Sequence, residues 1–518
     1  MQRLPEQTSV LIIGAGPCGL TLANLLQSYG TDCLVLEREA APLNLPRAIV
    51  LDDEGFRTLQ IFGLDESYLP RTLRGTGSLY IGEDGQAFAE TGAGPLTYGF
   101  SKRSFIHQPD LERALTGALL ARNAAALRYN AEVTAASQTP DGVCVTVNTP
   151  HGPQDIRAAY VVACDGGRSP MRERLGIAME GETYAQDWIV VDSLNDPDDD
   201  PRSKFFCSSA RPAVSVPAPN GGRRYEFMLQ PGETREEALS TPFLQKLLTP
   251  FRPWREEDFL RRTVYTFHAR MAARWREGRI FLAGDAAHLT PPFAGQGMNA
   301  GLRDATNLAW KLAAMLKAPR PETLAASYEQ ERRGPADDMI RLAVAMGSIV
   351  MPGDAAGRAF RDLLLQALKP FPAVRDYLIQ MRFKPKPHYT DGLLLGAQAP
   401  EFEGSLVGAM IPQPRMSDGR LLDHHLGSGF ALIGVGADTA AALSQVDRPA
   451  LCGLPLAAQQ MSWRGSEGLA SPDAALMRAF ATHRGQILLI RPDRYCAAAF
   501  WPADLARGLA DYEALCGF

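Results

Sequence analysis

The sequence predicts an α/β protein with more than one domain, and three observations support this fold class. The chain has 518 residues, which is more than one ordinary domain holds. A short apolar run at residues 10–13 leads into a glycine-rich segment, residues 14–19, and a helical pattern follows. Similar apolar runs at residues 160–164 and 279–283 each precede an Asp–Gly or Gly–Asp pair. Buried strands that alternate with helices favour a parallel sheet of the Rossmann type.

The glycine-rich segment has the spacing G-x-G-x-x-G. We expect Gly14 to permit the tight turn, Gly16 to let the backbone approach a pyrophosphate, and Gly19 to let helix and strand pack closely. The next apolar run ends at Glu37, whose carboxylate would accept hydrogen bonds from a ribose. The free N–H groups at the helix N-terminus would bind the phosphates. This motif predicts a dinucleotide site but does not distinguish FAD from NAD.

Two later motifs favour FAD. The run at residues 160–164 leads to Asp165 in an Asp–Gly turn. The run at 279–283 leads to a Gly–Asp pair whose aspartate, Asp285, would bind the hydroxyls of a ribityl chain. Gly295 and Gly297 in the next loop would let backbone N–H groups approach a flavin ring. A helix begins near Asn299, and its positive end would face that ring.

The order and spacing of the three motifs resemble those of the flavoprotein aromatic hydroxylases of the para-hydroxybenzoate hydroxylase type. The resemblance covers roughly residues 8–390. Other stretches are most similar to the branch of 3-(3-hydroxyphenyl)propionate hydroxylases, namely residues 46–49, 186–192, 225–228, 270–276 and 381–385. The resemblance implies an enzyme that uses FAD, NADH or NADPH as a transient co-substrate, and O2. Its implied reaction is hydroxylation of a phenolic substrate ortho to an existing hydroxyl group.

The motifs and the resemblance together define a predicted cofactor site. The resemblance implies that Arg47 and Gln108 also contact FAD, and that Asp165 serves both FAD and the nicotinamide. The predicted FAD-binding residues are Gly14, Ala15, Gly16, Pro17, Gly19, Glu37, Arg38, Arg47, Gln108, Asp165, Gly284, Asp285, Pro292, Gly295, Gly297, Met298 and Asn299.

The catalytic base is left unassigned. The substrate-side candidates are Ser215, Arg224, Tyr265, His268, Pro292 and Phe293. Tyr265, His268 and His107 are also candidates for activating the phenol, although a lone histidine is more often structural. Glu226 fits the polar face of a strand. The branch of 3-(3-hydroxyphenyl)propionate hydroxylases carries a Trp–Gln pair where this chain has Phe293-Ala294. The resemblance therefore leaves the exact substrate open.

Composition excludes several classes of function. The net charge of −5 provides no basic field for nucleic acid or anionic lipid. No apolar run is long enough to cross a bilayer. The eight cysteines form no C-x-x-C pair, and no cysteine–histidine cluster has zinc spacing. We therefore expect a cytoplasmic enzyme with reduced thiols and no metal.

The domain organisation follows from the motifs, the strand-like segments and the resemblance. A discontinuous FAD-binding domain with a helical extension is expected over residues 1–77, 99–182 and 276–390. A substrate-binding sheet is expected over 78–98 and 183–275, and a linker near 385–387. Residues 391–518 resemble the thioredoxin-like domain of the phenol hydroxylase branch. Their apolar strands predict packing on the main body or on a second subunit, as in a homodimer.

Alternative functions belong to several classes. A hydroxylase of a larger polycyclic or polyketide phenol is the first, and a flavin reductase or a non-catalytic flavin-binding sensor is the second. A flavin halogenase is disfavoured because its W-x-W-x-I-P signature is absent. A disulfide reductase is disfavoured because the chain has no C-x-x-C pair.

Overall fold

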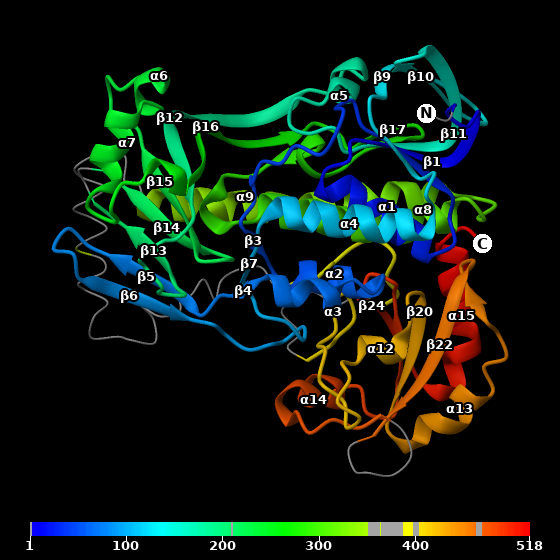
Figure 1. Cartoon of the computed structure of the whole chain (residues 1–518). Helices are drawn as coiled ribbons and strands as arrows, with labels where there is room; N and C mark the ends of the chain where they lie inside the picture. The colour runs from blue at the N-terminus through cyan, green and yellow to red at the C-terminus, as the bar shows by residue number, and fades with distance from the viewer. Residues whose placement is uncertain (1–2, 209–210, 351–362, 364–386, 397–403, 463–468) are drawn as a thin grey trace.

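A computed structural model describes residues 3–208, 211–350, 363, 387–396, 404–462 and 469–518. The fold is mixed α/β, as the sequence predicted, with two large sheets and a smaller C-terminal sheet around a central group of helices (Figure 1). Much of the predicted helical pattern beyond residue 350, part of the predicted linker near 385–387 and the stretch 381–385 lie outside the described residues.

The first sheet has eight strands and a parallel centre. Its strands are β1 (Gln7–Ile13), β2 (Cys33–Leu36), β8 (Leu127–Arg128), β9 (Glu132–Thr139), β10 (Gly142–Thr149), β11 (Gly152–Ala163), β17 (Arg276–Glu277) and β18 (Ile280–Leu282). β1 lies between β2 and β11, and β18 pairs with the other edge of β11. The carboxyl ends of these parallel strands therefore meet at one edge, which brings the three motifs together.

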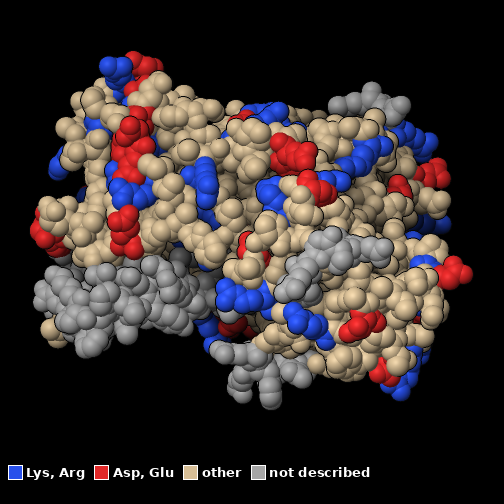
Figure 2. All heavy atoms as spheres, turned by 90° about the horizontal axis from the view of Figure 1, so that it is seen from below, with Lys and Arg blue, Asp and Glu red and all other residues tan. Residues whose placement is uncertain are grey.

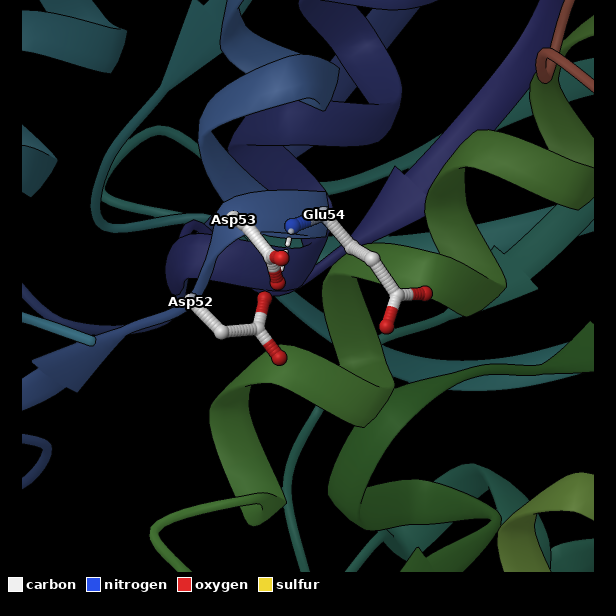
Figure 3. Close-up of side chains that lie close together, drawn as sticks. All are labelled: Asp52, Asp53 and Glu54. Carbon is white, nitrogen blue, oxygen red and sulfur yellow. Dashed lines mark hydrogen bonds between the residues drawn. The ribbon is translucent and has the colours of Figure 1, made fainter. Parts of the chain in front are cut away.

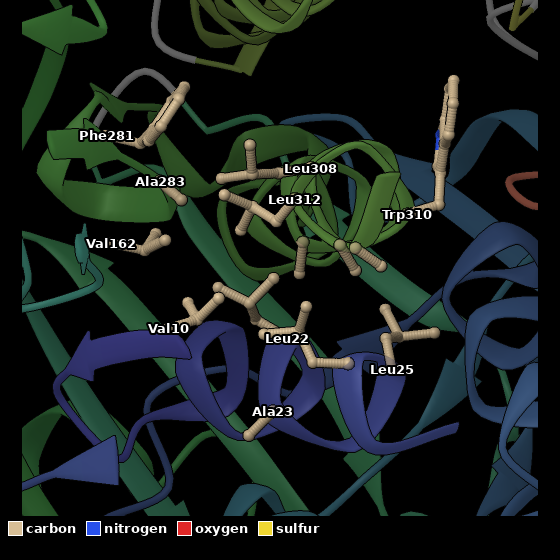
Figure 4. Packing of buried hydrophobic residues seen from close by; sticks show 14 of the residues in the cluster. Val10, Leu22, Ala23, Leu25, Val162, Phe281, Ala283, Leu308, Trp310 and Leu312 are labelled. Atoms are coloured by element: carbon tan, nitrogen blue, oxygen red, sulfur yellow. The ribbon is translucent and has the colours of Figure 1, made fainter. Parts of the chain in front are cut away.

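Long helices cover this sheet. They include α1 (Pro17–Ser28), α4 (Gln108–Arg122), α8 (Gly297–Met315) and α9 (Glu322–Val350). α1 packs against α4 and α8, and α8 packs against α9. Leu22 and Leu25 of α1 and Leu308 and Leu312 of α8 are fully buried in the core between the helices and the sheet (Figure 4). Burial of such side chains contributes about 1.5–3 kcal/mol each, so this core holds both helices against the sheet.

The second sheet is formed by three separate segments of the chain, and the last of them contributes only β19. Its strands are β5 (Gly77–Ile81), β6 (Ala87–Gly92), β12 (Met179–Ser193), β13 (Ser203–Phe206), β14 (Ala213–Ala218), β15 (Gly222–Met228), β16 (Phe259–Ala272) and β19 (His288–Leu289). A small sheet of β3 (Val50–Leu51), β4 (Leu73–Arg74) and β7 (Ser104–Phe105) lies near α2 (Asp53–Ile61). The domain boundaries set out above remain predictions.

The C-terminal sheet has the strand order β21-β22-β20-β23-β24. β20 (Phe430–Val435) is parallel to β22 (Leu454–Met461) and antiparallel to β23 (Ile487–Ile490), and β24 (Cys496–Phe500) is antiparallel to β23. The remaining elements are β21 (Ala450–Leu451), α12 (Asp423–Leu426), α13 (Ala440–Ser444), α14 (Ala474–Ala481) and α15 (Leu505–Leu515). This arrangement agrees with the predicted thioredoxin-like fold.

Buried ion pairs attach the C-terminal sheet to the main body. Arg57 of α2 lies 2.7 Å from Asp423, and Arg491 lies 2.6 Å from Glu331 of α9. All four side chains are almost fully buried. The C-terminal domain therefore packs on the main body of its own chain, which is one of the two packing partners predicted for it (Figure 1).

One face of the molecule carries mixed charges. On the face in Figure 2, Lys and Arg side chains are interspersed with Asp and Glu side chains and with uncharged residues. Among the described residues, no helix has the length and hydropathy required of a membrane span.

Candidate active site

Two adjoining cavities lie at the carboxyl edge of the first sheet. The first has a volume of about 360 Å³ and the second about 180 Å³, and together they fall within the usual range for ligand pockets. Six residues line both cavities: Gly16, Pro17, Arg47, Gln108, Cys164 and Gly166. The shared lining indicates one elongated site with two ends.

The three motif glycines have different environments. Gly14 has φ +102°, and a Cβ atom there would lie 2.5 Å from the carbonyl oxygen of Cys164. A Cβ atom on Gly19 would lie 2.1 Å from the carbonyl oxygen of Gly14. A Cβ atom on Gly16 would meet nothing within 4 Å, because this residue borders both cavities. Gly14 and Gly19 are thus required by the fold, whereas Gly16 leaves room for a ligand.

Acidic groups line the second cavity. The Ala15 N–H donates to the Glu37 carboxylate at 2.8 Å, which fixes that side chain beside the glycine turn. Asp165 accepts a hydrogen bond from the Met171 N–H at 3.1 Å through Oδ2. Its Oδ1 atom is buried and has no hydrogen-bond partner among the described residues. Burial raises the pKa of Asp165. An unpaired buried acceptor of this kind fits a ligand that donates hydrogen bonds, such as a ribose.

Asp285 lines the first cavity just beyond β18. Its side chain is exposed, yet burial raises its pKa while His288 and Arg47 oppose that shift. Both observations hold because the carboxyl lines the first cavity, where solvent reaches it although protein atoms surround it. The position fits the hydroxyl groups of a ribityl chain.

The loop before α8 is held by Asn299. Its amide donates to the carbonyl oxygens of Gly295 at 2.9 Å and Val50 at 3.1 Å, and its Oδ1 accepts from the Asp52 N–H at 3.1 Å. Asn299 is buried and lines neither cavity, so it shapes the loop instead. Gly297 and Met298 at the uncapped start of α8 line the first cavity.

The loop that carries Arg47 is fixed from two sides. Gln108 accepts a hydrogen bond from the Ala48 N–H at 2.6 Å. Arg224 of β15 donates to the carbonyl oxygens of Pro46 and Arg47, the second at 2.6 Å, and forms an ion pair with Asp192 at 2.7 Å. Arg224 lines the first cavity, but its guanidinium mainly positions this loop.

The remaining predicted cofactor residues divide between the two ends of the site. Gly14, Ala15, Glu37, Arg38 and Asp165 line the second cavity, and Gly284, Asp285, Pro292, Gly295, Gly297 and Met298 line the first. Gly19 lines neither cavity. The donors, acceptors and open backbone therefore fit an elongated dinucleotide such as FAD, and these residues would hold it.

The substrate end has an apolar wall. It is formed by Ile49, Phe205, Val214, Val216 and Phe293, all of which line the first cavity. The Phe293 ring makes edge contacts with Trp188 and Phe267, at centroid distances of 5.9 and 5.4 Å. This wall suits an aromatic ring.

Three substrate-side candidates line neither cavity. Ser215 lies between Val214 and Val216, so it points to the opposite face of β14, where its hydroxyl accepts from Arg223 at 2.9 Å. Tyr265 contacts Arg261. The two histidines named as candidates for activating the phenol contact nearby groups. His268 lies 3.0 Å from the Thr183 hydroxyl, and His107 lies 3.2 Å from Asp110. Of the six substrate-side candidates, Arg224, Pro292 and Phe293 therefore line the first cavity, whereas the other three lie outside both cavities.

Arg103 was not among the predicted site residues, and Glu226 was predicted only as part of the polar face of a strand. Both line the first cavity. Glu226 follows Arg224 by two positions, so strand alternation alone could have placed both on one face of β15. Burial raises the pKa of Glu226, although Arg224 and Arg261 oppose that shift. Nothing in the sequence around Arg103 distinguishes it from a surface arginine.

A separate acidic group at the start of α2 is explained by local structure. Asp52, Asp53 and Glu54 lie close together (Figure 3). The Asp52 carboxylate caps α2 by accepting from the Gly55 N–H at 2.9 Å, and Arg303 of α8 pairs with Asp52 and with Glu54 at 2.8 Å. The group therefore joins α2 to α8.

Different substitutions should separate the two ends of the site. Asp285→Ala should weaken FAD binding by roughly 10- to 100-fold, because a charged hydrogen-bond acceptor is lost. Phe293→Ala should instead change the order of preference among phenols, because its ring forms part of the apolar wall. FAD dissociation constants and kcat/KM over a phenol panel measure the two effects. A Phe293→Ala variant that loses flavin but keeps the order of preference would contradict this assignment.

Known family models match most of the chain. A family model described as an FAD binding domain matches residues 7–343, and one described as the HcaD C-terminal domain matches residues 408–515. A 3-(3-hydroxy-phenyl)propionate/3-hydroxycinnamic acid hydroxylase of Klebsiella pneumoniae is 38% identical, over 96% of this chain and 93% of the relative. The Mycolicibacterium smegmatis protein of the same name is 36% identical, over 96% and 91%.

A solved structure extends the similarity to the whole fold. The anhydrotetracycline hydroxylase of Streptomyces rimosus is 28% identical and superposes with a TM-score of 0.74, over 99% of both chains. The matched FAD binding domain spans the motifs and both cavities described above. The chain belongs to the family of FAD-dependent aromatic hydroxylases, which are monooxygenases built on this FAD binding domain.

Proposed function

We propose that the protein hydroxylates a phenolic acid of the 3-(3-hydroxyphenyl)propionate or 3-hydroxycinnamate type, ortho to the existing hydroxyl. The names of the two relatives support this substrate class. The observation that carries the proposal is the composition of the first cavity. Its apolar wall suits a benzene ring, while Arg103 and Glu226 supply one cation and one acid for the polar ends of such a molecule.

The proposed roles of the residues follow from their positions. Bound FAD would take a hydride from NAD(P)H and, with O2, supply the oxygen atom that is placed on the ring. The apolar wall would orient the ring and exclude water. Glu226 would accept the hydrogen bond of the phenol hydroxyl, which makes the ring more electron-rich. Arg224 and Gln108 would keep the Arg47 loop in place beside the cofactor.

The NAD(P)H binding mode also follows from the sequence. The chain has one dinucleotide fingerprint, so the nicotinamide would visit the site without a Rossmann domain of its own. The choice between NADH and NADPH, the cytoplasmic location and the homodimer remain predictions.

The proposal predicts that the purified yellow protein oxidises NAD(P)H faster when a hydroxylated phenylpropionate or cinnamate is added. Isotopically labelled O2 should place one oxygen atom in a catechol product, identified by mass spectrometry. Benzoates, simple phenols and polycyclic phenols complete the substrate panel. NAD(P)H oxidation without a hydroxylated product would favour a flavin reductase, and a hydroxyl derived from water would contradict a monooxygenase.

A further inference from the structure

Three arginines line the first cavity: Arg47, Arg103 and Arg224. They differ in the groups that surround their guanidinium charges. Arg224 pairs with Asp192 at 2.7 Å and donates to the backbone of the Arg47 loop. Arg47 also lines the second cavity, where FAD is expected. Arg103 lines only the first cavity, at the substrate end.

Arg103 lies just before β7 and reaches the second sheet. Its Nη1 donates to the Ser78 hydroxyl of β5 at 3.0 Å, and Ser78 is paired with Ser203 of β13. Ser203 and Phe205 of the same strand also line the cavity, so the Arg103 guanidinium lies where the sheet meets the cavity.

The charge of Arg103 has no carboxylate partner within 4.0 Å among the described residues. Ion pairs with a carboxylate are present for most of the buried arginines that the structure describes, including Arg57, Arg224 and Arg491. Arg103 is half-buried, and a neutral hydroxyl such as Ser78 offsets only part of the cost of removing a guanidinium from water. A guanidinium in a cavity with free donors matches a carboxylate, which it can bind through two hydrogen bonds.

We infer that Arg103 binds the carboxylate of the substrate's side chain and so selects phenolic acids over neutral phenols. This inference rests on the proposed function. Glu226, in the same cavity, would repel a carboxylate and accept a hydroxyl hydrogen bond. The two opposite charges therefore fix one orientation, with the acid at Arg103 and the phenol hydroxyl at Glu226.

The test compares two substrates that differ only in charge at the end of the side chain. These are 3-(3-hydroxyphenyl)propionate and 3-(3-hydroxyphenyl)propan-1-ol. In Arg103→Met, kcat/KM for the acid should fall by roughly 10- to 100-fold, while kcat/KM for the alcohol should change by less than about threefold. The kcat/KM of Arg103→Lys for the acid should lie between the values of the wild type and of Arg103→Met. FAD content and thermal midpoint confirm that each variant is folded.

A binding measurement keeps this inference separate from the proposed function. Titration with 3-phenylpropionate, which lacks the hydroxyl, is followed through the absorbance of bound FAD and needs no turnover. Roughly 10- to 100-fold weaker binding in Arg103→Met would support the inference, even if neither phenol is hydroxylated. A lack of hydroxylation would contradict only the proposed function. Equal losses for the acid and the alcohol would indicate a structural role and overturn the inference. Unchanged 3-phenylpropionate binding would overturn it as well.

Discussion

Replacing Gly16 with valine should give a folded protein that no longer retains FAD. A Cβ atom at this position meets no protein atom within 4 Å, so the fold can accept a side chain. The same side chain would extend into the space that the two cavities share, at the N-terminus of α1. We expect FAD affinity to fall on the order of 100-fold, because an overpacked contact costs about 1–3 kcal/mol. The FAD-to-protein absorbance ratio measures the loss, and circular dichroism checks the fold.

Two other glycines serve as controls for Gly16. Gly117 lies on the exposed side of α4, where a Cβ atom also meets nothing within 4 Å, so Gly117→Val should keep its FAD. Gly14→Val should lower the yield of folded protein, because φ is +102° and the side chain would collide with Cys164 of the neighbouring segment. A yellow Gly16→Val protein with unchanged FAD affinity would show that the pyrophosphate does not approach this residue.

The sequence correctly predicted that the three motifs meet at one edge of the first sheet, because the geometry of parallel strands requires it. Each motif follows an apolar run, and the carboxyl ends of paired parallel strands must lie at one edge. For Gly14, the sequence predicted only the tight turn. The structure adds that a Cβ atom there would lie 2.5 Å from the carbonyl oxygen of Cys164. Of the three motif glycines, only Gly16 has its open side toward the cavities.

The substrate end was harder to predict because it depends on strand faces and distant packing. Alternation along β14 and β15 predicts which residues share a face of the strand, but it does not predict which face lines the cavity. Ser215 was therefore assigned to the wrong face, while Glu226 was left as a surface residue. The Arg103 side chain reaches Ser78 of β5, and β5 pairs with β13, a strand from a later segment whose Ser203 and Phe205 also line the cavity. Pairings between distant segments leave no local pattern in the sequence.

The residues that join the C-terminal domain to the main body could not be predicted from the sequence either. Glu331 of α9 accepts hydrogen bonds from Lys311 at 2.7 Å, from Asn307 at 2.7 Å and from Arg491 at 2.6 Å. Arg491 also pairs with Asp493 at 2.6 Å, and these charged side chains are almost fully buried. Burial lowers the pKa of Lys311 to about 8, although Glu331 opposes that shift.

Glu331→Ala should destabilise the protein by about 3–5 kcal/mol, because it leaves two buried cations with a single carboxylate. Lys311 can lose its proton in response, but Arg491 keeps its charge at any accessible pH. The urea midpoint should fall strongly, and the C-terminal domain should become sensitive to protease before the FAD-binding domain does. Asp337→Ala is the matched control on the same helix. Asp337 pairs with Arg341 at 2.7 Å on the exposed face, so its loss should cost at most about 0.5 kcal/mol. Equal urea midpoints for the two variants would mean that the buried ion pairs do not hold the two parts of the chain together.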